Sequence, residues 1–173
     1  MATPKRPDIL GRPGVDPLDA RAARVAALDA LARRDHASTE LRQKLSDKGY
    51  DGLVVDELIE HLFAEKLLDD QRYLQNFVAY HAARGQGPNR VRADLRKRGL
   101  KTPDAEAALE AYPDWLTHLK RARQKKFGTS LPTIYADRQR QAKFLAYRGF
   151  TGAQIRAALG FDTDLDADTT EDP

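Results

Sequence analysis

Apolar residues recur every three or four positions along most of the chain. This spacing places them on one face of a helix and predicts that this face is buried. No stretch shows a convincing alternation of apolar and polar residues, so the pattern predicts an all-α protein. The clearest runs are Leu18, Ala22, Val25, Leu28 and Ala32; Val55, Leu58, Ile59, Leu62 and Phe63; and Tyr73, Leu74, Phe77 and Val78.

The sequence also repeats itself at an interval of fifty residues. At five positions, similar residues occur in all three copies of the repeat. A basic residue also precedes each repeated glycine (Lys48, Arg98 and Arg148). Such a period is typical of a tandem array of small structural units. The matching sets are Leu45, Leu95 and Leu145; Gly49, Gly99 and Gly149; Tyr50, Leu100 and Phe150; Val55, Ala105 and Ile155; and Ile59, Leu109 and Leu159.

Each repeated position has a physical role in a short helical hairpin. The leucine faces the core, and the glycine four residues later takes the left-handed conformation that ends the helix. The next apolar side chain folds back over that helix end, and the following helix buries two residues spaced four apart. Thr102 and Pro103 mark the start of this last helix in the second copy, as a cap and a first-turn proline.

A longer helix is predicted before each hairpin, at about 17–35, 70–84 and 115–127. Asp16 is the predicted cap of the first one, with Pro17 at its first position. Each unit then has three helices and is too small for a good core alone, so we expect neighbouring units to stack in an elongated or curved array. The predicted domains are an arm at 1–16, repeats at 17–69, 70–112 and 113–160, and a tail at 161–173.

The charge of the chain is unevenly distributed. The formal net charge is +3, yet residues 161–173 hold six acids and no base, which leaves +9 on residues 1–160. The proline-rich arm is expected to be flexible and the acidic tail disordered. The alternative for the tail is that it competes with DNA phosphate for the basic surface of the same chain.

The sequence offers little for catalysis. There is no cysteine, and no two of the four histidines have the i, i+4 spacing of a helical zinc pair. Asp69 and Asp70 are interpreted as a cap and a first-turn acid, and Gly85 to Pro88 is too short for a phosphate loop. We therefore expect no enzyme, no metal and no cofactor. No apolar run is long enough to span a membrane and no secretory signal is found, so a cytoplasmic protein is expected.

Two basic clusters are the strongest indication of a binding surface. Residues 84–101 hold seven Lys or Arg against one acid, and residues 115–148 hold nine against one. Such a density suits phosphate or an acidic protein groove. The candidates are Arg84, Arg90, Arg92, Arg96, Lys97, Arg98, Lys120, Arg121, Arg123, Lys125, Lys126, Arg138, Arg140 and Lys143.

Other roles compete with binding at several of these positions. Arg98 and Arg148 each lie in the last turn of a helix, where they can instead cap carbonyl groups. Phe127, Tyr135 and Tyr147 can stack on bases, although burial in the third unit is the favoured interpretation. No base-reading element is recognisable.

The order and spacing of several motifs resemble the RecX regulators. The second unit holds Leu67 to Tyr73, Arg84 to Val91 and Asp94 to Leu100 in the family's sequence order. Ala32 to His36 with Glu40 to Leu45 is similar to the first RecX repeat. Lys143 to Leu145 with Arg148 to Phe150 is similar to the third. The resemblance covers about residues 20–160.

This resemblance implies a protein without enzymatic activity that binds the RecA recombinase. RecX proteins are understood to act on the RecA–DNA filament and to suppress filament growth, ATP hydrolysis, strand exchange and cleavage of the SOS repressor. The basic surface also leaves open an alternative, a helical protein that binds single- or double-stranded DNA directly and without sequence preference. A monomer is expected, with a dimer formed by exchange of one repeat as the open alternative.

Overall fold

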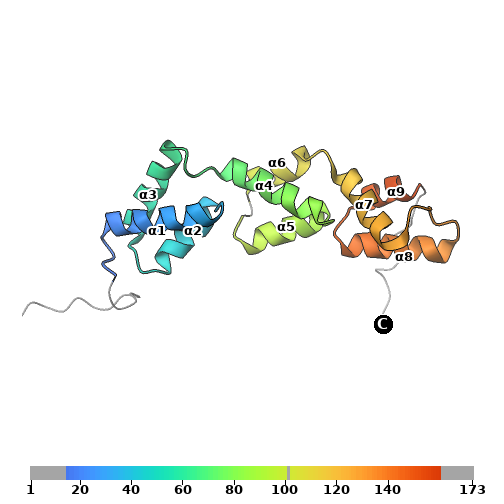
Figure 1. The fold of residues 1–173 in the computed structure, drawn as a ribbon, viewed down its shortest axis with the longest axis horizontal. Coiled ribbons are helices and arrows are strands. Elements are labelled where there is room, and N and C mark those ends of the chain that lie inside the picture. The colour runs from blue at the N-terminus through green and yellow to red at the C-terminus, as the bar shows by residue number, and fades with distance from the viewer. Residues whose placement is uncertain (1–14, 101, 161–173) are drawn as a thin grey trace, which may run out of the picture. The chain divides into compact units, whose positions relative to one another are not determined.

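The structure is a computed structural model that describes residues 15–100 and 102–160. All regular structure in these ranges is helical, and the helices form three consecutive groups of three (Figure 1). The expected all-α fold is therefore confirmed. The helices are α1 (Ala20–Arg33), α2 (Ser38–Ser46), α3 (Gly52–Ala64), α4 (Asp70–Ala83), α5 (Pro88–Lys97), α6 (Pro103–Ala111), α7 (Trp115–Phe127), α8 (Tyr135–Tyr147) and α9 (Gly152–Leu159).

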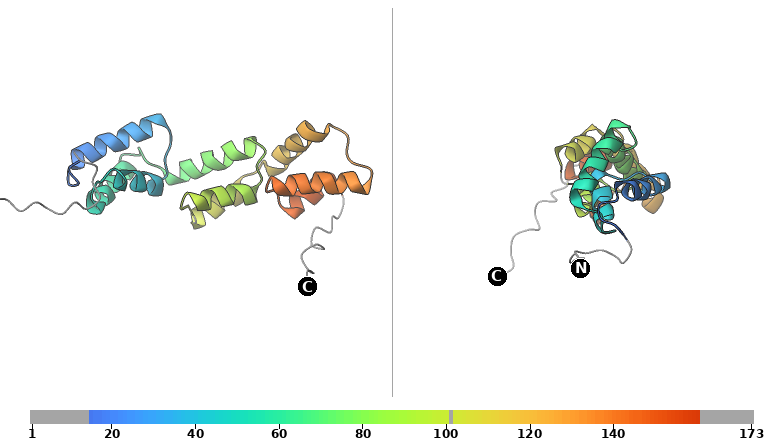
Figure 2. Two further views of the ribbon diagram at one scale, coloured as in Figure 1. Left: turned by 90° about the horizontal axis from the view of Figure 1, so that it is seen from below. Right: turned by 90° about the vertical axis from the view of Figure 1, so that its left-hand side faces the viewer.

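The chain divides into two compact units, residues 1–73 and 74–173, with the boundary inside α4. In the first unit α1, α2 and α3 pack on one another. In the second unit α5 packs on α6, and α7, α8 and α9 form a three-helix group, drawn in orange to red in Figure 2. The exact residue limits of the three repeats remain a prediction.

The leucines of the fifty-residue repeat, and the paired residues of the helix that follows each, are buried at matching places. Leu45, Leu95 and Leu145 all lie in the core. Their hairpin partners in the following helices, Val55 and Ile59 in the first repeat, are buried as well, as are their counterparts Ala105, Leu109, Ile155 and Leu159. The apolar pattern therefore identified the core of the α2–α3, α5–α6 and α8–α9 hairpins.

The turn after α2, α5 and α8 has the same backbone geometry each time. Gly49, Gly99 and Gly149 have φ values of 99°, 78° and 89°. The next N–H donates back to the leucine carbonyl five residues earlier, for example Phe150 to Leu145 at 3.1 Å. This is the Schellman arrangement that satisfies the last carbonyl groups of a helix.

Helix starts agree with the predictions in the second repeat and differ in the first. The Thr102 hydroxyl accepts a hydrogen bond from the Ala105 N–H at 3.2 Å, so this predicted cap is confirmed. The prediction for α1 was wrong, because the helix begins at Ala20 and Asp19 is its cap, accepting from the Ala22 N–H at 2.8 Å. Asp16 instead accepts from the N–H of Leu18, one turn earlier.

The predicted buried face of α1 was also wrong. Leu18 and Val25 are 58% and 55% exposed, whereas Ala23, Ala27 and Ala30 lie in the core of the first repeat. Small side chains allow α1 to approach α2 and α3 closely, and the bulkier residues of the neighbouring face are left outside. Phe63 at the end of α3, also predicted to be buried, is 40% exposed.

The predicted flexible arm falls almost entirely on residues 1–14, and the predicted acidic tail falls on residues 161–173. Both lie outside the described residues. Among the helices of residues 15–100 and 102–160, none is long and apolar enough to cross a membrane.

Candidate functional site

The turn after α8 is joined to the start of α5 by backbone hydrogen bonds. The Gly87 N–H donates to the Arg148 carbonyl at 2.8 Å, and the Asn89 N–H donates to the Gly149 carbonyl at 2.9 Å. These bonds connect parts of the second and third repeats that both lie within residues 74–173, the second compact unit. The segment from Gly85 to Asn89 therefore acts as a structural joint between repeats.

Glycine makes this close approach possible. A Cβ atom on Gly87 would come within 2.2 Å of the Phe150 nitrogen, and one on Gly149 would come within 2.5 Å of the Arg90 Cβ. Gly149 thus has two requirements, a positive φ and an empty position facing Arg90. Its counterpart Gly99 has a positive φ but nothing within 4 Å of the added atom.

Beside this joint lies a cleft of about 450 Å³ with a strongly basic lining. Five cationic side chains and His118 contribute to it, and no acidic residue does. The cations come from the end of α4 (Arg84), from α7 (Arg121, Lys125 and Lys126) and from the turn after α8 (Arg148). We call this group of residues the basic cleft.

Aromatic rings and carbonyl groups hold the cations in place. The Lys126 Nζ atom lies 4.5 Å from the centre of the Phe144 ring, and the Arg148 guanidinium carbon lies 5.2 Å from it. Arg148 also donates to the Arg84 carbonyl at 3.2 Å, across 64 residues of sequence. Since like charges repel, five cations this close favour an anionic ligand.

His118 connects the cleft to α6. The Tyr112 hydroxyl lies 2.8 Å from the His118 Nε2 atom, and the two rings are stacked. Burial raises the pKa of the Tyr112 hydroxyl, and the nearby Asp114 carboxylate raises it further. The tyrosine therefore stays neutral at physiological pH and fixes the orientation of the imidazole at the edge of the cleft.

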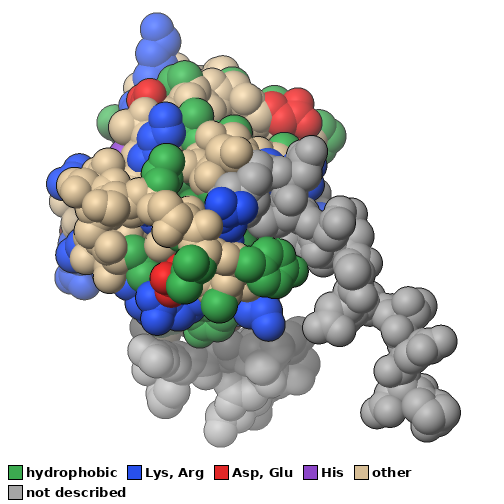
Figure 3. Space-filling view, turned by 90° about the vertical axis from the view of Figure 1, so that its right-hand side faces the viewer, with side chains coloured by type: hydrophobic (Ala, Val, Ile, Leu, Met, Phe, Trp, Pro, Cys, Tyr) green, Lys and Arg blue, Asp and Glu red, His purple; other side chains and the backbone are tan. Residues whose placement is uncertain are grey.

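The structure brings four of the predicted binding residues together and separates the others. Arg84, Arg121, Lys125 and Lys126 line the basic cleft. On α5, Arg92 pairs with Glu106 at 2.8 Å and Arg90 is 3.6 Å from Asp94. The remaining candidates outside the cleft are Arg96, Lys97 and Arg98 near the end of α5, Lys120 on α7, and Arg138, Arg140 and Lys143 on α8. Figure 3 presents a face on which basic side chains are more widespread than acidic ones.

Arg123 was wrongly placed among the binding candidates. Its side chain is only 3% exposed and donates to the carbonyls of Gly128, Thr129 and Ser130 at 2.9–3.0 Å. A further hydrogen bond of 3.1 Å reaches the Gln141 side chain. Arg123 therefore fastens the inserted α7–α8 link to the core of the third repeat and offers no charge to a ligand.

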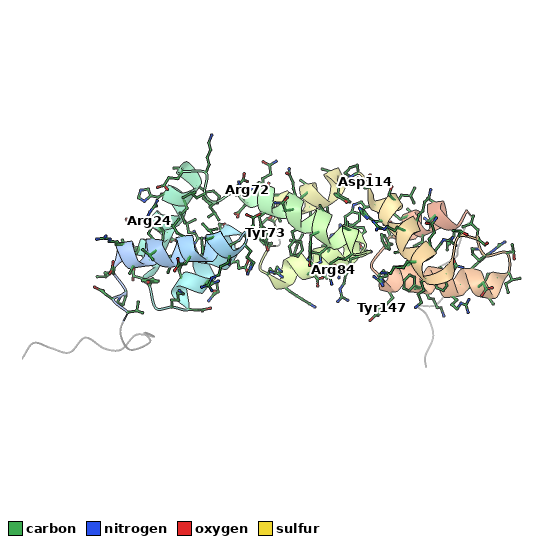
Figure 4. All side chains as sticks on the ribbon, in the orientation of Figure 1. Arg24, Arg72, Tyr73, Arg84, Asp114 and Tyr147 are labelled. Carbon is green, nitrogen blue, oxygen red and sulfur yellow. The ribbon has the colours of Figure 1, made fainter. Side chains whose placement is uncertain are left out.

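The two tyrosines of α8 differ from their predicted burial. Tyr135 and Tyr147 are 73% and 81% exposed, and Figure 4 shows Tyr147 directed away from the helices. Phe127 is half-buried and packs edge-to-face on Phe144. The sequence could not separate these cases, because an aromatic residue at either end of α8 fits both a core and a surface position.

A second cavity, on the first repeat, has a different character. Its volume is about 460 Å³, and its lining includes Asp19 and Asp29 as well as Arg21 and Lys48. The formal charges of these four side chains cancel, so this cavity has no preference for an anion. Within residues 15–100 and 102–160 no group of three potential metal ligands is found.

Comparison with known protein families gives three matches in chain order. The family described as "RecX, first three-helix domain" matches residues 23–62. The second RecX three-helix domain matches residues 69–109, and the third matches residues 114–159. The chain belongs to the RecX family. Its three-helix repeats are therefore the three RecX domains, and the resemblance proposed from the sequence is confirmed.

Relatives support the same assignment over most of the chain. The protein named "Regulatory protein RecX" of Halorhodospira halophila is 44% identical over 138 residues, which cover 79% of this chain and 86% of the relative. The protein of that name from Pseudomonas savastanoi pv. phaseolicola is 43% identical over 130 residues, covering 75% and 84%. The RecX family is regulatory and not enzymatic, and so is this chain.

A solved structure shows the same fold at lower sequence identity. The crystal structure of RecX from Lactobacillus salivarius superimposes with a TM-score of 0.70 and 21% identity. The match covers 82% of this chain and 95% of the solved one. The all-helical architecture of three-helix domains is thus shared by the two proteins.

Proposed function

We propose that this protein binds RecA–DNA filaments and inhibits filament extension, ATP hydrolysis, strand exchange and RecA co-protease activity. It would in this way modulate homologous recombination and the SOS response in the cytoplasm. Membership of the RecX family, whose relatives are named as regulatory proteins, supports the regulatory role. The observation that supports a contact surface for the filament is the basic cleft, which has five cations and no acid in its lining.

The cleft suits the phosphate backbone of DNA in such a filament. Arginine and lysine contacts to phosphate displace condensed counterions and give affinity without reading the base sequence. Arg121 and Lys125 lie four residues apart on α7 and so share one face of the helix. Several modest contacts along a filament add through avidity, which lets a small protein act below stoichiometry.

The first test is DNA-stimulated ATP hydrolysis by RecA from the same cell, with this protein titrated far below the RecA concentration. The native chain is expected to inhibit strongly. The variant Arg121→Glu/Lys125→Glu should lose most of that inhibition, because both side chains line the cleft. The matched control is Arg21→Glu/Arg33→Glu on α1, which changes the net charge by the same amount but alters no residue of the cleft. This variant should inhibit like the native protein.

The basic residues on α5 suggest a different variant, Arg92→Glu/Arg96→Glu, which the structure argues against as a first choice. Arg92 forms hydrogen bonds with Glu106 and Asn89, so a glutamate there would face Glu106 and lower stability. The α7 variant avoids this, since both of its side chains are directed into the cleft lining. Absence of inhibition by the native chain would contradict the RecA proposal.

The second candidate function is direct, sequence-nonspecific DNA binding without RecA. The same basic cleft supports it. Direct phosphate binding should weaken steeply with salt, with a slope close to −0.9 per phosphate contact for duplex DNA. If this protein binds DNA equally well with and without RecA and does not change ATP hydrolysis by RecA, the second function is favoured over the first.

A further inference from the structure

We propose that the acidic C-terminal segment, residues 161–173, binds the basic cleft of its own chain and competes there with nucleic-acid phosphate. The inference rests on the proposed function insofar as the cleft is taken to bind DNA phosphate. The contact itself is intramolecular and can be measured with neither RecA nor DNA present. Charge, reach and spacing each support it.

The charges of the two partners are complementary and unmixed. The segment holds six carboxylates and no basic residue. The cleft lining holds five Lys or Arg and no acidic residue. The other cavity, with Asp19 and Asp29 in its lining, offers no comparable attraction.

The cleft is within reach of the segment. The last described residue is Gly160, which ends α9, and α9 packs on both α7 and α8. These two helices and the turn after α8 supply most of the cleft lining. Thirteen extended residues span up to ~43 Å, about twice the ~20 Å length of a 13-residue helix such as α7.

The spacing of the acids imitates a nucleic-acid strand. Asp162, Asp164, Asp166 and Asp168 occupy every second position. In an extended chain, residues two apart project to the same side about 6.6–6.8 Å from one another. A row of single charges at this interval resembles the phosphates of an extended single strand, and the tether gives the segment a high effective concentration at the cleft.

The first experiment measures the contact directly. Because the chain has no cysteine, Thr170→Cys gives one attachment point for a nitroxide spin label. In ¹⁵N-labelled protein at 50 mM NaCl, we expect broadening of the backbone amides of Gly85, Arg121 and Lys125. The broadening should disappear when Asp162, Asp164, Asp166 and Asp168 are all changed to Asn. If the cleft amides show no broadening in the spin-labelled protein with its four aspartates intact, the proposal is overturned.

The second experiment measures the competition, with fluorescein-labelled oligo(dT) of twenty nucleotides as the probe. Changing the four aspartates to Asn should tighten binding about tenfold at 50 mM NaCl, and by much less at 500 mM, where charge is screened. In the background of Arg121→Gln/Lys125→Gln the gain should fall below about twofold. In the control background of Arg21→Gln/Arg33→Gln it should stay near tenfold.

The outcomes separate the two proposals. An equal gain in both backgrounds would mean general repulsion of DNA by the segment and would overturn the assigned contact. Broadening at the cleft without inhibition of RecA would leave this inference standing and contradict only the proposed function.

Discussion

Asp70, in the first turn of α4, caps the start of α2 by accepting two hydrogen bonds from Ser38. The backbone N–H of Ser38 donates to Oδ1 at 2.7 Å, and the Ser38 hydroxyl donates to Oδ2 at 2.5 Å. The residue before α2 is Ala37, which has no side chain able to cap. Asp69 meanwhile caps α4 itself, accepting from the Arg72 N–H at 2.9 Å. The adjacent acids therefore serve two different helices.

Replacing Asp70 should destabilise the first compact unit. Asp70→Ala removes the cap of α2 and is expected to cost about 1–2 kcal/mol in the free energy of unfolding. A double-mutant cycle with Ser38→Ala, measured by urea denaturation, should give a coupling energy of about 1 kcal/mol. Additive effects of the two changes would show that the hydrogen bonds do not contribute.

Gly149 and Gly99 occupy the same position of the repeat and should respond differently to alanine. Gly99→Ala introduces only an unfavourable positive φ and should cost about 1 kcal/mol. Gly149→Ala adds a steric overlap with Arg90 and should cost about 3 kcal/mol or more. Thermal unfolding of the two variants side by side tests this. Equal shifts of the midpoint would contradict the close approach of the two repeats.

Arg123→Met should destabilise the third repeat by about 3 kcal/mol, because three carbonyl groups of the α7–α8 link lose their buried donor. The control is Arg121→Met on the same helix, whose exposed side chain should change stability by less than about 0.5 kcal/mol. DNA binding should show the converse. Arg121→Met should weaken DNA binding. Arg123→Met should leave the DNA affinity of the folded fraction of that variant unchanged.

His36 should make stability depend on pH. Its ring is buried and its Nδ1 atom lies 2.9 Å from the Arg34 carbonyl. Burial lowers the pKa of His36 below 6.5, and the nearby Arg34 and Lys44 charges add to this against the opposing effects of the carbonyl and Glu40. The unfolded chain therefore binds a proton more readily than the folded one.

The stabilisation from neutral His36 is present above pH 6.5 and is lost as the pH falls below that value. The urea midpoint of the native protein should accordingly drop between pH 7.5 and pH 5. His36→Gln should be less stable at pH 7.5 and should show a flatter pH profile over the same range. A profile as steep as the native one would assign the pH dependence to other groups.

The repeat and its hairpins could be predicted because their signals are local. The leucine, glycine and following apolar residue specify a helix end through backbone conformation and burial alone, and these act over five or six residues. The same holds for the cap at Thr102. For α1 the local signal was ambiguous, since apolar residues lie on two adjacent faces and only packing against α2 and α3 chooses between them.

The candidate site was only partly predictable. Arg84, Arg121, Lys125 and Lys126 were selected for their charge density, which is a property of composition, and they do line one cleft. Arg123 belongs to the same run and could not be told apart, because its burial depends on the path of the α7–α8 link. Phe144 gave no binding signal, and Arg148 was counted in the basic run of residues 115–148 but not chosen as a candidate. The place of both in the cleft follows from the joint at Gly87 and Gly149.

By itself the sequence determined the helices, the threefold repeat, the RecX resemblance and the excess of positive charge, because each of these follows from local periodicity, turn chemistry or composition. Only the tertiary structure decided which basic residues face a common space. Contacts such as the Arg148 hydrogen bond to Arg84 join residues 64 positions apart. No local pattern encodes that distance, since it depends on two backbones meeting where glycine leaves room.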